Sequence, residues 1–484
     1  MRWRPLALVE RQWESEREYA DPLRDVHVEV AFTSPTGTRM ELPAFWKGGR
    51  LWGVRADLDA PGRWLYRVTA SVRGDRGLHE RRGQCNVEAS AGPPLGRGLV
   101  PCRGHFALAD GTPWAWLGDG AWDGLSASTD EDWARYLAVR RQQGFTAVQA
   151  LLLPRHGSRA ARWALGQGGP GTPNPEFFAR LDLRVEQVVR HGLVPVLGLL
   201  PASSLEDAGN ALDEASAVLL ARYLLARYAA FHPVWLLAVG AELSGAGADR
   251  WRRVGHGVFA GQDLGPASIL PRPGQLPDGR LLEADWLSFA AVDLDVGRAA
   301  ELGRARRALC GPKPIVNLQS SPATPCADGS VTRRLWSSLL GLSAAGAGLT
   351  HPAVAAWREN GEGQEATWYR GLESAGSRTV SHLANWWARC PGYRLQPWER
   401  GAQPQSASPP GDILLAQTPD GAQRVALVPA GAPVPSWMDS PEYTGLWLDP
   451  ASGAWWRPPA RSRDPATRDR VLWSWLGRSR ALVL

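Results

Sequence analysis

The chain has 484 residues, of which 44% are hydrophobic and 21% are charged, and this balance is typical of a globular protein. Its length predicts about two to four domains. The formal net charge of +6 comes from dispersed arginines, since Lys47 and Lys313 are the only lysines. We therefore expect no nucleic-acid partner, which would require a basic stripe or patch.

Targeting, membrane and metal signals are missing from the sequence. Each apolar run ends short of the roughly 18 residues that a membrane-spanning helix needs. The opening residues, MRWRPLALVERQWESE, are too poor in apolar residues for a signal peptide. The five cysteines form no CxxC pair, and the nine histidines show no paired-ligand spacing. We therefore expect a cytoplasmic protein with no membrane association, no disulfide framework, no metal and no other cofactor.

Residues 1–94 predict an antiparallel β-sandwich. The segment DVHVEVAFTSPTG alternates apolar residues from Val26 to Phe32 and then turns. GRWLYRV repeats the alternation, and short strands at this spacing are typical of a sandwich. The predicted domain ends in the linker EASAGPPLGRG.

Residues 95–404 predict a (β/α)₈ barrel. Residues 128–154, 173–201 and 213–242 each hold a helical pattern, then a glycine or turn, then a buried apolar strand. In the first unit, an apolar stripe of the helix includes Arg140. Four further strands are predicted at WAWLG, WLSFAAVD, KPIVNLQ and GAGLTHPAVA. An open doubly wound sheet is the second choice, because the first βα turn carries no GxGxxG.

Residues 405–484 predict a small C-terminal β-sandwich. They follow a linker rich in Pro, Ser, Gly and Gln. Hairpins are expected around Pro419-Asp420-Gly421 and around 449–453.

One carboxylate follows an apolar strand directly. In HPVWLLAVGAELSG, the run from Val234 to Val239 breaks at Gly240 and leads to Glu242. Glu242 is either an ordinary loop residue or a catalytic carboxylate at the C-terminal end of a barrel strand. The 25 tryptophans raise a sugar-binding hypothesis, because the apolar face of a sugar packs on flat aromatic rings.

The order of these segments resembles the apiosidase-like family of glycoside hydrolases. The resemblance covers nearly the whole chain and rests on collinear pieces, among them HFALADGTPWAWLGDGAW, GFTAVQ, LARYAAFHPVWLLAVGAE, RRLWSSLLGLSAAGAGLTHPAVAAW and GLWLDPASGAW. It implies a β-sandwich, a (β/α)₈ catalytic barrel and a small C-terminal β-sandwich. It also implies hydrolysis of a glycosidic bond by two carboxylates.

The resemblance assigns the first carboxylate and not the second. The family's fourth strand ends in Gly-Gly-Asp or Gly-Gly-Glu, so VGAE places Glu242 as general acid/base. The family's seventh strand reads Lys-Pro-Val-x-x-Gly-Glu-Pro, whereas KPIVNLQSSP has Gln319 in place of the nucleophile. An amide cannot replace a carboxylate as nucleophile. Arg272, in LPRPGQ, stands where the family tends to have histidine.

Other acidic residues could supply the second carboxylate. The family's architecture places Asp119 and Asp123 near the same rim, and Asp293 and Asp295 end a predicted strand. Each is either a helix cap or loop residue, or a base about 6.5–9.5 Å from Glu242 in an inverting site.

The predicted site has catalytic and substrate-binding residues. The catalytic residues are Glu242, Asp119 and Gln319, and the substrate-binding residues are Trp122, Asp123, Gln149, Arg272 and Trp357. We expect a carbohydrate or oligosaccharide ligand at the C-terminal mouth of the barrel. Two hypotheses stay open: a glycoside hydrolase, or a catalytically inactive carbohydrate-binding or scaffold protein derived from one.

Overall fold

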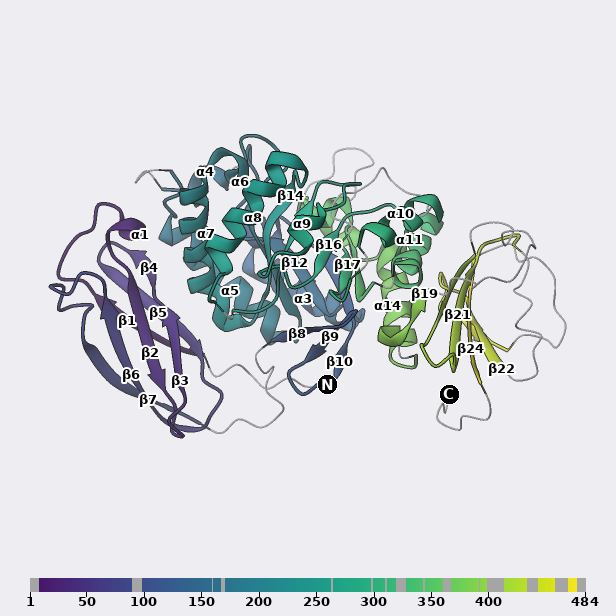
Figure 1. Cartoon of the computed structure of the whole chain (residues 1–484), viewed down its shortest axis with the longest axis horizontal. Helices are drawn as coiled ribbons and strands as arrows, with labels where there is room; N and C mark the ends of the chain where they lie inside the picture. The colour runs from purple at the N-terminus through teal and green to yellow at the C-terminus, as the bar shows by residue number, and fades with distance from the viewer. Residues whose placement is uncertain are drawn as a thin grey trace.

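The protein is described by a computed structural model, in which three parts follow one another along the chain (Figure 1). A pair of antiparallel sheets comes first, a barrel of parallel strands wrapped by helices forms the middle, and another antiparallel sheet ends the chain. The structure describes residues 8–88, 98–158, 160–166, 170–262, 264–296, 299–309, 311–318, 328–342, 344–359, 367–390, 392–397, 413–432, 443–457 and 469–476.

The N-terminal part is the predicted β-sandwich. Its two antiparallel sheets have the strand orders β1–β5–β4 and β3–β2–β6–β7. The alternating residues from Val28 to Phe32 are buried in a core shared with Trp13 and Trp52, which belong to the other sheet. Its elements are β1 (Leu8–Glu14), α1 (Pro22–Asp25), β2 (Val28–Thr33), β3 (Arg39–Pro43), β4 (Phe45–Gly48), β5 (Leu51–Asp57), β6 (Gly62–Ala70) and β7 (Arg81–Val87).

The middle part is a sheet of eight parallel strands in the order β15–β14–β13–β12–β11–β18–β17–β16. The strands are β11 (Trp116–Gly120), β12 (Ala147–Leu151), β13 (Val194–Pro201), β14 (Val234–Ala241), β15 (Ala267–Pro271), β16 (Ala290–Val292), β17 (Ile315–Asn317) and β18 (Gly346–Leu349). They follow one another around the sheet in chain order. This topology confirms the (β/α)₈ barrel and excludes a doubly wound sheet, in which the strand order reverses.

The seam between β15 and β16 closes through individual hydrogen bonds. The Ser268 hydroxyl donates to the Phe289 carbonyl at 2.6 Å and accepts from the Ala291 N–H at 3.2 Å. The Ser288 N–H donates to the Ala267 carbonyl at 2.7 Å. A side chain thus replaces part of the backbone ladder, and the ring of strands is nearly complete.

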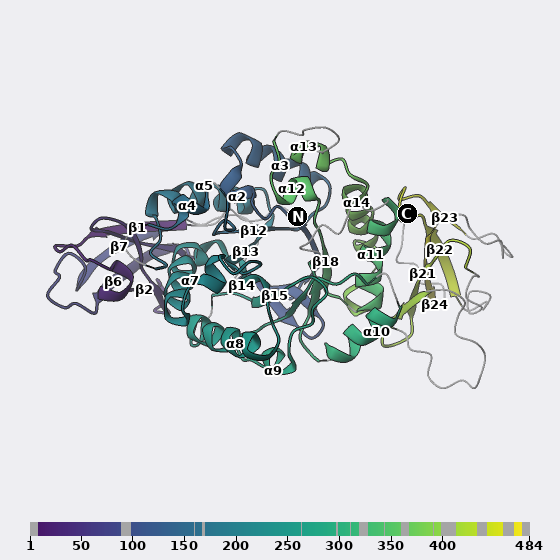
Figure 2. The same ribbon diagram turned by 90° about the horizontal axis from the view of Figure 1, so that it is seen from above.

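Helices alternate with the strands and surround them, as the view from above shows (Figure 2). The side chains of Thr129, Asn174 and Asp213 cap the three helices α3, α5 and α7 at the predicted starts. The helical elements are α2 (Gly124–Ala127), α3 (Asp130–Gln142), α4 (Ala161–Ala164), α5 (Pro175–Arg190), α6 (Ala208–Ala211), α7 (Glu214–Tyr228), η1 (Ala229–Phe231), α8 (Gly245–Phe259), α9 (Gly279–Leu282), α10 (Ala299–Ala308), α11 (Asp328–Gly341), α12 (Pro352–Ala355), α13 (Trp368–Gly371), α14 (Ala375–Trp387) and η2 (Gly392–Arg394).

A small sheet covers the amino-terminal end of the barrel. It has the order β10–β9–β8 and consists of β8 (Leu99–Cys102), β9 (His105–Leu108) and β10 (Pro113–Trp114). The ring of Phe106 lies against those of Trp116 and Phe289, with centroids 5.5 and 5.4 Å apart. Because aromatic rings fill this end, the opposite end of the barrel is the place for a ligand site.

The C-terminal part is built on one six-stranded antiparallel sheet, in the order β19–β20–β21–β24–β22–β23. Both predicted hairpins are present, between β20 and β21 and between β22 and β23. One face of the sheet shares a buried cluster with the barrel helices through Val425 and Trp473, and the other face carries Trp447. The strands are β19 (Gln396–Pro397), β20 (Leu414–Gln417), β21 (Gln423–Val428), β22 (Tyr443–Leu448), β23 (Trp455–Trp456) and β24 (Arg470–Leu476).

The two predicted domain boundaries, at 94/95 and 404/405, lie outside the described residues. The described elements on either side are β7 and β8 at the first boundary, and β19 and β20 at the second. Since β19 pairs with β20, the C-terminal sheet already begins before residue 404.

A buried ion network joins the sandwich to the barrel. Arg55 on β5 donates to the Asp182 carboxylate on α5 and, at 3.1 Å, to the Arg227 carbonyl on α7. Two nitrogens of Arg227 donate to the same carboxylate at 2.8 Å each. Burial alone would raise the pKa of Asp182, but the hydrogen bonds from Arg55 and Arg227 outweigh it and lower that pKa. One ionised carboxylate therefore holds two arginines from different elements.

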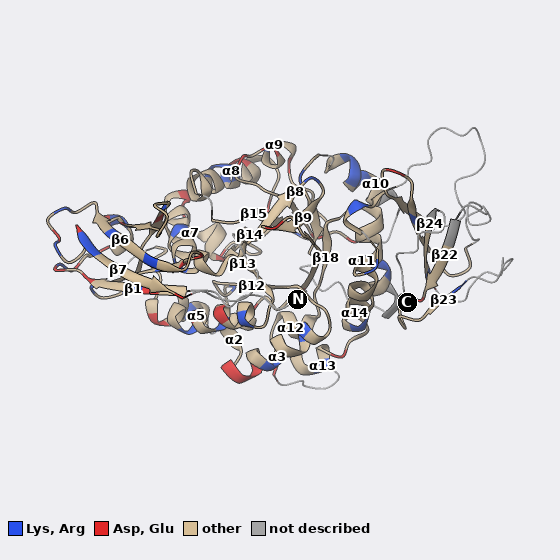
Figure 3. Ribbon diagram, turned by 90° about the horizontal axis from the view of Figure 1, so that it is seen from below, with Lys and Arg blue, Asp and Glu red and all other residues tan. Residues whose placement is uncertain are grey.

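Basic side chains are scattered over the sandwich, the barrel helices and the C-terminal sheet (Figure 3). The first turn of α3 is acidic and consists of Asp130, Glu131 and Asp132. No helix in the described part of the chain has both the length and the apolar character needed to cross a membrane.

Candidate active site

Glu242 lies at the carboxyl-terminal rim of the barrel. It is the first residue after β14, the fourth barrel strand in chain order. Gly240 turns the chain just before it with φ of 78°, and a Cβ at that position would lie 2.2 Å from Ser203 Oγ. Glycine therefore allows the loop after β13 to pack against the end of β14. Barrel enzymes carry their catalytic groups at this end of their strands.

Both oxygens of the Glu242 carboxylate accept hydrogen bonds. Ser244 Oγ donates to Oε1 at 2.5 Å, and Arg272 Nη1 donates to Oε2 at 3.0 Å. Gln275 Nε2 lies 3.3 Å from Oε1 and 3.1 Å from Oε2. Arg272 and Gln275 come from the loop after β15, the neighbouring strand. The Glu242 side chain keeps 35% of its exposure, so a ligand can reach it.

These contacts favour the ionised form of Glu242. Hydrogen bonds from Ser244 and Gln275 lower its pKa, and the positive charge of Arg272 acts in the same direction. A general acid needs a raised pKa, because it must carry a proton at the working pH. Glu242 was predicted as general acid/base, and this role stays a prediction; a lowered pKa favours the part of the base.

Asp123 lies at the same rim, just after β11. It precedes α2, yet its carboxylate makes no capping hydrogen bond to that helix. Arg155 Nη1, from the loop after β12, lies 3.4 and 3.3 Å from its two oxygens. Burial raises the pKa of Asp123; Arg155 opposes this shift, and the negative charge of Asp207 adds to it. Its side chain is still 25% exposed, so Asp123 is an accessible carboxyl group whose pKa is raised by burial.

Asp207 ties two rim loops together. Its buried carboxylate accepts the N–H of His156 at 2.8 Å, of Ser203 at 2.9 Å and of Ser204 at 2.8 Å. His156 belongs to the loop after β12, and the two serines belong to the loop after β13. The Asp207 carboxylate lies close enough to Asp123 to raise the pKa of Asp123.

Asp119, predicted as catalytic, faces away from the rim. Along β11 the side chain of Trp116 points into the barrel and that of Leu117 toward the helices, so Asp119 also faces the helices. There the Tyr136 hydroxyl donates to it at 2.6 Å and Arg140 Nε at 2.7 Å. The side chains of Asp119 and Arg140 are both 0% exposed. This is a structural ion pair, and we leave Asp119 out of the active site.

Trp122 and Trp357, predicted to bind substrate, are both buried. Trp122 is 0% exposed. Trp357 stacks on Trp368 with centroids 4.7 Å apart, and Trp133 and Tyr136 lie against it as well. Neither ring offers an open face to a sugar. All tryptophans whose side-chain burial the structure describes are buried or partly buried, so most of these rings serve packing.

Gln149 lies in the barrel interior, below the rim. It shares the inner face of β12 with Ala147 and Leu151. Its amide nitrogen fits beside Gly118 and Gly348, where a Cβ would come within 2.3 and 2.7 Å of it. The side chain is 0% exposed, and neither of its polar atoms has a hydrogen-bond partner among the described residues. Because its side chain is fully buried, Gln149 offers no surface to a ligand at the rim.

We expect Gln149→Met to leave the free energy of unfolding unchanged or to raise it, by up to about 1–3 kcal/mol. The reason is that a methionine of similar length removes an unpaired buried amide. Gln143→Met is the matched control, because Gln143 accepts from Arg140 at 2.8 Å and donates to the Leu372 carbonyl at 2.7 Å. Chemical denaturation measures both. Equal losses of stability in the two variants would contradict the prediction.

The remaining predicted residues are placed as follows. Asp293 and Asp295 come after β16; Asp293 is buried and Asp295 is exposed. The Asp293 carbonyl accepts the Gly274 N–H at 2.7 Å, which joins the loops after β15 and β16. KPIVNLQ does contain the seventh barrel strand, β17. Gln319 lies outside the described residues, so its role stays a prediction.

Four residues that shape the rim were not predicted from the sequence. They are Arg155, Asp207, Ser244 and Gln275. Arg155, Asp207 and Ser244 follow barrel strands that were predicted, so their signal was a place at the carboxyl end of a strand. Gln275 follows β15, which was not among the predicted strands, so it had no such signal. Among the described residues, no group of His, Cys, Asp or Glu is arranged to hold a metal ion.

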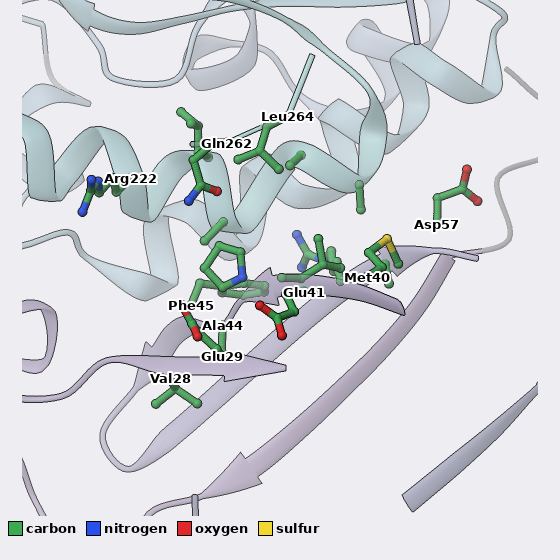
Figure 4. Close-up of a pocket in the computed structure, with 18 of the residues that line it drawn as sticks. Val28, Glu29, Met40, Glu41, Ala44, Phe45, Asp57, Arg222, Gln262 and Leu264 are labelled. Carbon is green, nitrogen blue, oxygen red and sulfur yellow. The ribbon is translucent and has the colours of Figure 1, made fainter. Parts of the chain in front are cut away.

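A hollow of about 1220 Å³ lies elsewhere, between the sandwich and the barrel helices α7 and α8. Glu29 and Glu41 line it from the sandwich, and Arg222 and Gln262 line it from the helices (Figure 4). None of the predicted site residues borders it. Volume alone therefore does not identify the candidate site, since Glu242 and Asp123 lie at the barrel rim and not in this hollow.

Comparison with solved structures supports the fold. A protein from Bacteroides vulgatus ATCC 8482 described as a candidate glycoside hydrolase is 15% identical with a TM-score of 0.71, over 97% of this chain and 98% of that one. A second structure, described as a glycoside hydrolase, is 15% identical with a TM-score of 0.66, over 80% and 99%. A family 5 glycoside hydrolase from the same Bacteroides is 14% identical with a TM-score of 0.65, over 78% and 93%.

Comparison with protein families is more specific. A domain of unknown function (DUF5060) matches residues 2–71, and no curated protein matches the chain. The model of the apiosidase-like catalytic domain matches residues 103–393, which is more than half of the sequence. The chain therefore belongs to the apiosidase-like family.

Proposed function

We propose that this chain binds a carbohydrate at the carboxyl-terminal mouth of its barrel and hydrolyses a glycosidic bond there. The observation that carries the proposal is Glu242, an accessible carboxylate on the first residue after the fourth strand of a glycoside hydrolase-like barrel. Hydrolysis of this kind uses two carboxyl groups, one to protonate the leaving oxygen and one to attack or to activate water. Glu242, held ionised by its donors, suits the second task.

Binding without cleavage is the second candidate function, and a specific feature favours it. If the resemblance aligns the seventh strand correctly, Gln319 occupies the place of the family's nucleophile. Glu242 also already accepts hydrogen bonds from Ser244, Gln275 and Arg272. A rim of this kind would recognise a sugar through its polar groups and leave the glycosidic bond intact.

A screen with aryl glycosides, pentosides included, tests the proposal. We expect the wild type to release the aryl alcohol, and Glu242→Gln to lower kcat by about 10²–10⁴-fold, because the amide cannot accept the proton. Glu206→Gln is the control, since Glu206 is an exposed carboxylate on the loop after β13. Thermal unfolding should be the same in all three proteins.

Three other outcomes separate the candidates. Calorimetric sugar binding without turnover supports the second function, and Gln319→Glu should then restore hydrolysis with retention at the anomeric carbon. Activity that survives Glu242→Gln contradicts the role of Glu242. Neither binding nor turnover across the panel contradicts both functions.

A further inference from the structure

Two carboxyl groups in opposite environments share the barrel rim, Asp123 after the first strand and Glu242 after the fourth. We infer that Asp123 is the general acid of the proposed hydrolysis and Glu242 its general base, an assignment that rests on the proposed function. The site is then an inverting one, and it needs no carboxylate at position 319.

The first support is that Asp123 lacks the structural role that two neighbouring acidic residues have. The Asp119 carboxylate accepts hydrogen bonds from Arg140 and Tyr136, and the Asp207 carboxylate accepts them from three backbone N–H groups. Asp123 instead leaves α2 without a side-chain cap and meets Arg155 only at 3.3–3.4 Å. A partly exposed carboxyl group that neither caps a helix nor forms a close ion pair is available to a ligand.

The second support is the set of charges around each carboxyl group. Asp123 is faced by Arg155 from the loop after β12 and by the fixed negative charge of Asp207 from the loop after β13. Glu242 is faced by Arg272 and Gln275. Burial and Asp207 favour a protonated Asp123, whereas the donors around Glu242 favour its anion. Environments that shift the pKa values of two carboxyl groups in opposite directions identify one group as an acid and the other as a base.

The third support is continuity along the rim. Asp207 lies beside Asp123 and accepts the N–H of Ser203. Ser203 in turn packs against Gly240, two residues before Glu242. The loop after β13 therefore lies beside Asp123 through Asp207 and beside the end of β14 through Ser203. Inverting hydrolases keep such a pair about 6.5–9.5 Å apart, so that a water molecule fits between the base and the anomeric carbon.

The proton balance of the step is complete. Asp123 gives its proton to the glycosidic oxygen as the bond from that oxygen to the anomeric carbon breaks. Water forms the new bond to the anomeric carbon and loses a proton to Glu242. Asp123 is left ionised and Glu242 protonated, and exchange with solvent restores both groups.

Leaving groups of graded acidity test the role of Asp123. We expect Asp123→Asn to lower kcat by about 10²–10⁴-fold on phenyl glycosides, whose leaving group needs a proton. On 2,4-dinitrophenyl glycosides, whose leaving group departs as an anion, kcat should hardly change. Asp123→Glu should recover part of the loss on phenyl glycosides. Circular dichroism confirms that the variants are folded.

The pH profile and the product provide independent readouts. The alkaline limb of kcat/KM should disappear in Asp123→Asn. In Asp207→Asn it should move to lower pH, because the lost negative charge no longer favours protonated Asp123. Proton NMR of the first product should show inversion at the anomeric carbon.

Three results would overturn the assignment. Equal losses on both leaving groups would give Asp123 a structural role, and a retained anomeric configuration would require a nucleophile. Sugar binding with no turnover of any glycoside by the wild type would also reject the acid–base pair, while leaving the carbohydrate site of the proposed function in place. An absence of both binding and turnover would reject the two together.

Discussion

Asp119→Ala should lower the free energy of unfolding by about 3–5 kcal/mol, because it leaves a buried arginine without its counter-charge. The Arg140 side chain is 0% exposed and donates to Asp119 at 2.7 Å. Its other partners, Ser377 Oγ and Gln143 Oε1 at 2.8 Å, are neutral. The Tyr136 hydroxyl loses its acceptor in the same substitution. Chemical denaturation followed by tryptophan fluorescence measures the loss.

Two controls make this result specific. Glu186→Ala breaks an exposed ion pair with Arg190, and such pairs contribute little, so stability should hardly change. The double variant Asp119→Leu/Arg140→Met should regain much of the loss, since an apolar pair of similar size removes both buried charges. A single variant as stable as the wild type would mean that water reaches Arg140.

The same ion pair shows what the sequence contained and what was overlooked. The helical stripe of α3 was predicted correctly, with Trp133, Tyr136 and Arg140 on the buried face. A charge on a buried face requires a partner of opposite sign. Asp119 lies on the adjoining strand with the outward parity of Leu117, so the pairing with Arg140 could have been inferred. That inference would have excluded Asp119 from the predicted catalytic residues.

The barrel itself could be predicted because its signals are local. The caps Asn174 and Asp213 and the continuous apolar strands repeat in each unit. The place of Glu242 followed from the same count of strands. The contacts of Glu242 with Ser244, Arg272 and Gln275 could not be predicted, because these residues meet it only after two loops fold over the rim. The number of tryptophans did not identify a site for another reason. Amino-acid composition does not distinguish a tryptophan ring in the core from one that stacks on a sugar.

The rim suggests how hydrolysis could persist without the family's nucleophile. Gln319 rules out a covalent intermediate at that position if the seventh strand aligns as the resemblance implies. An inverting mechanism needs only an acid and a base. In the assignment that we propose, Asp123 and Glu242, which follow the first and fourth barrel strands, supply these groups.

Asp182→Ala should cost about 3–5 kcal/mol and loosen the contact of the sandwich with the barrel. The substitution leaves two guanidinium groups, Arg55 and Arg227, facing each other without their shared carboxylate. Their side chains are 8% and 1% exposed, so water does not compensate either charge. Scanning calorimetry should show the wild-type transition at higher temperature than the variant, and limited proteolysis should release the sandwich from the variant first. Thr129→Ala, which removes the exposed cap of α3, is the control that keeps the interface intact.

The pH dependence of this contact has a definite sign. Because Arg55 and Arg227 lower the pKa of Asp182 in the folded protein, the carboxylate contributes stability that is fully present above its unfolded pKa of about 3.9. That contribution is lost as the pH falls through the folded pKa. The wild type should therefore lose more stability than Asp182→Asn when the pH is lowered below about 4, because the variant has no proton to take up at this position. Parallel acid-denaturation curves for the two proteins would show that the network does not hold the sandwich in place, and Glu10, the other acid that bonds Arg55, would then be the partner to replace next.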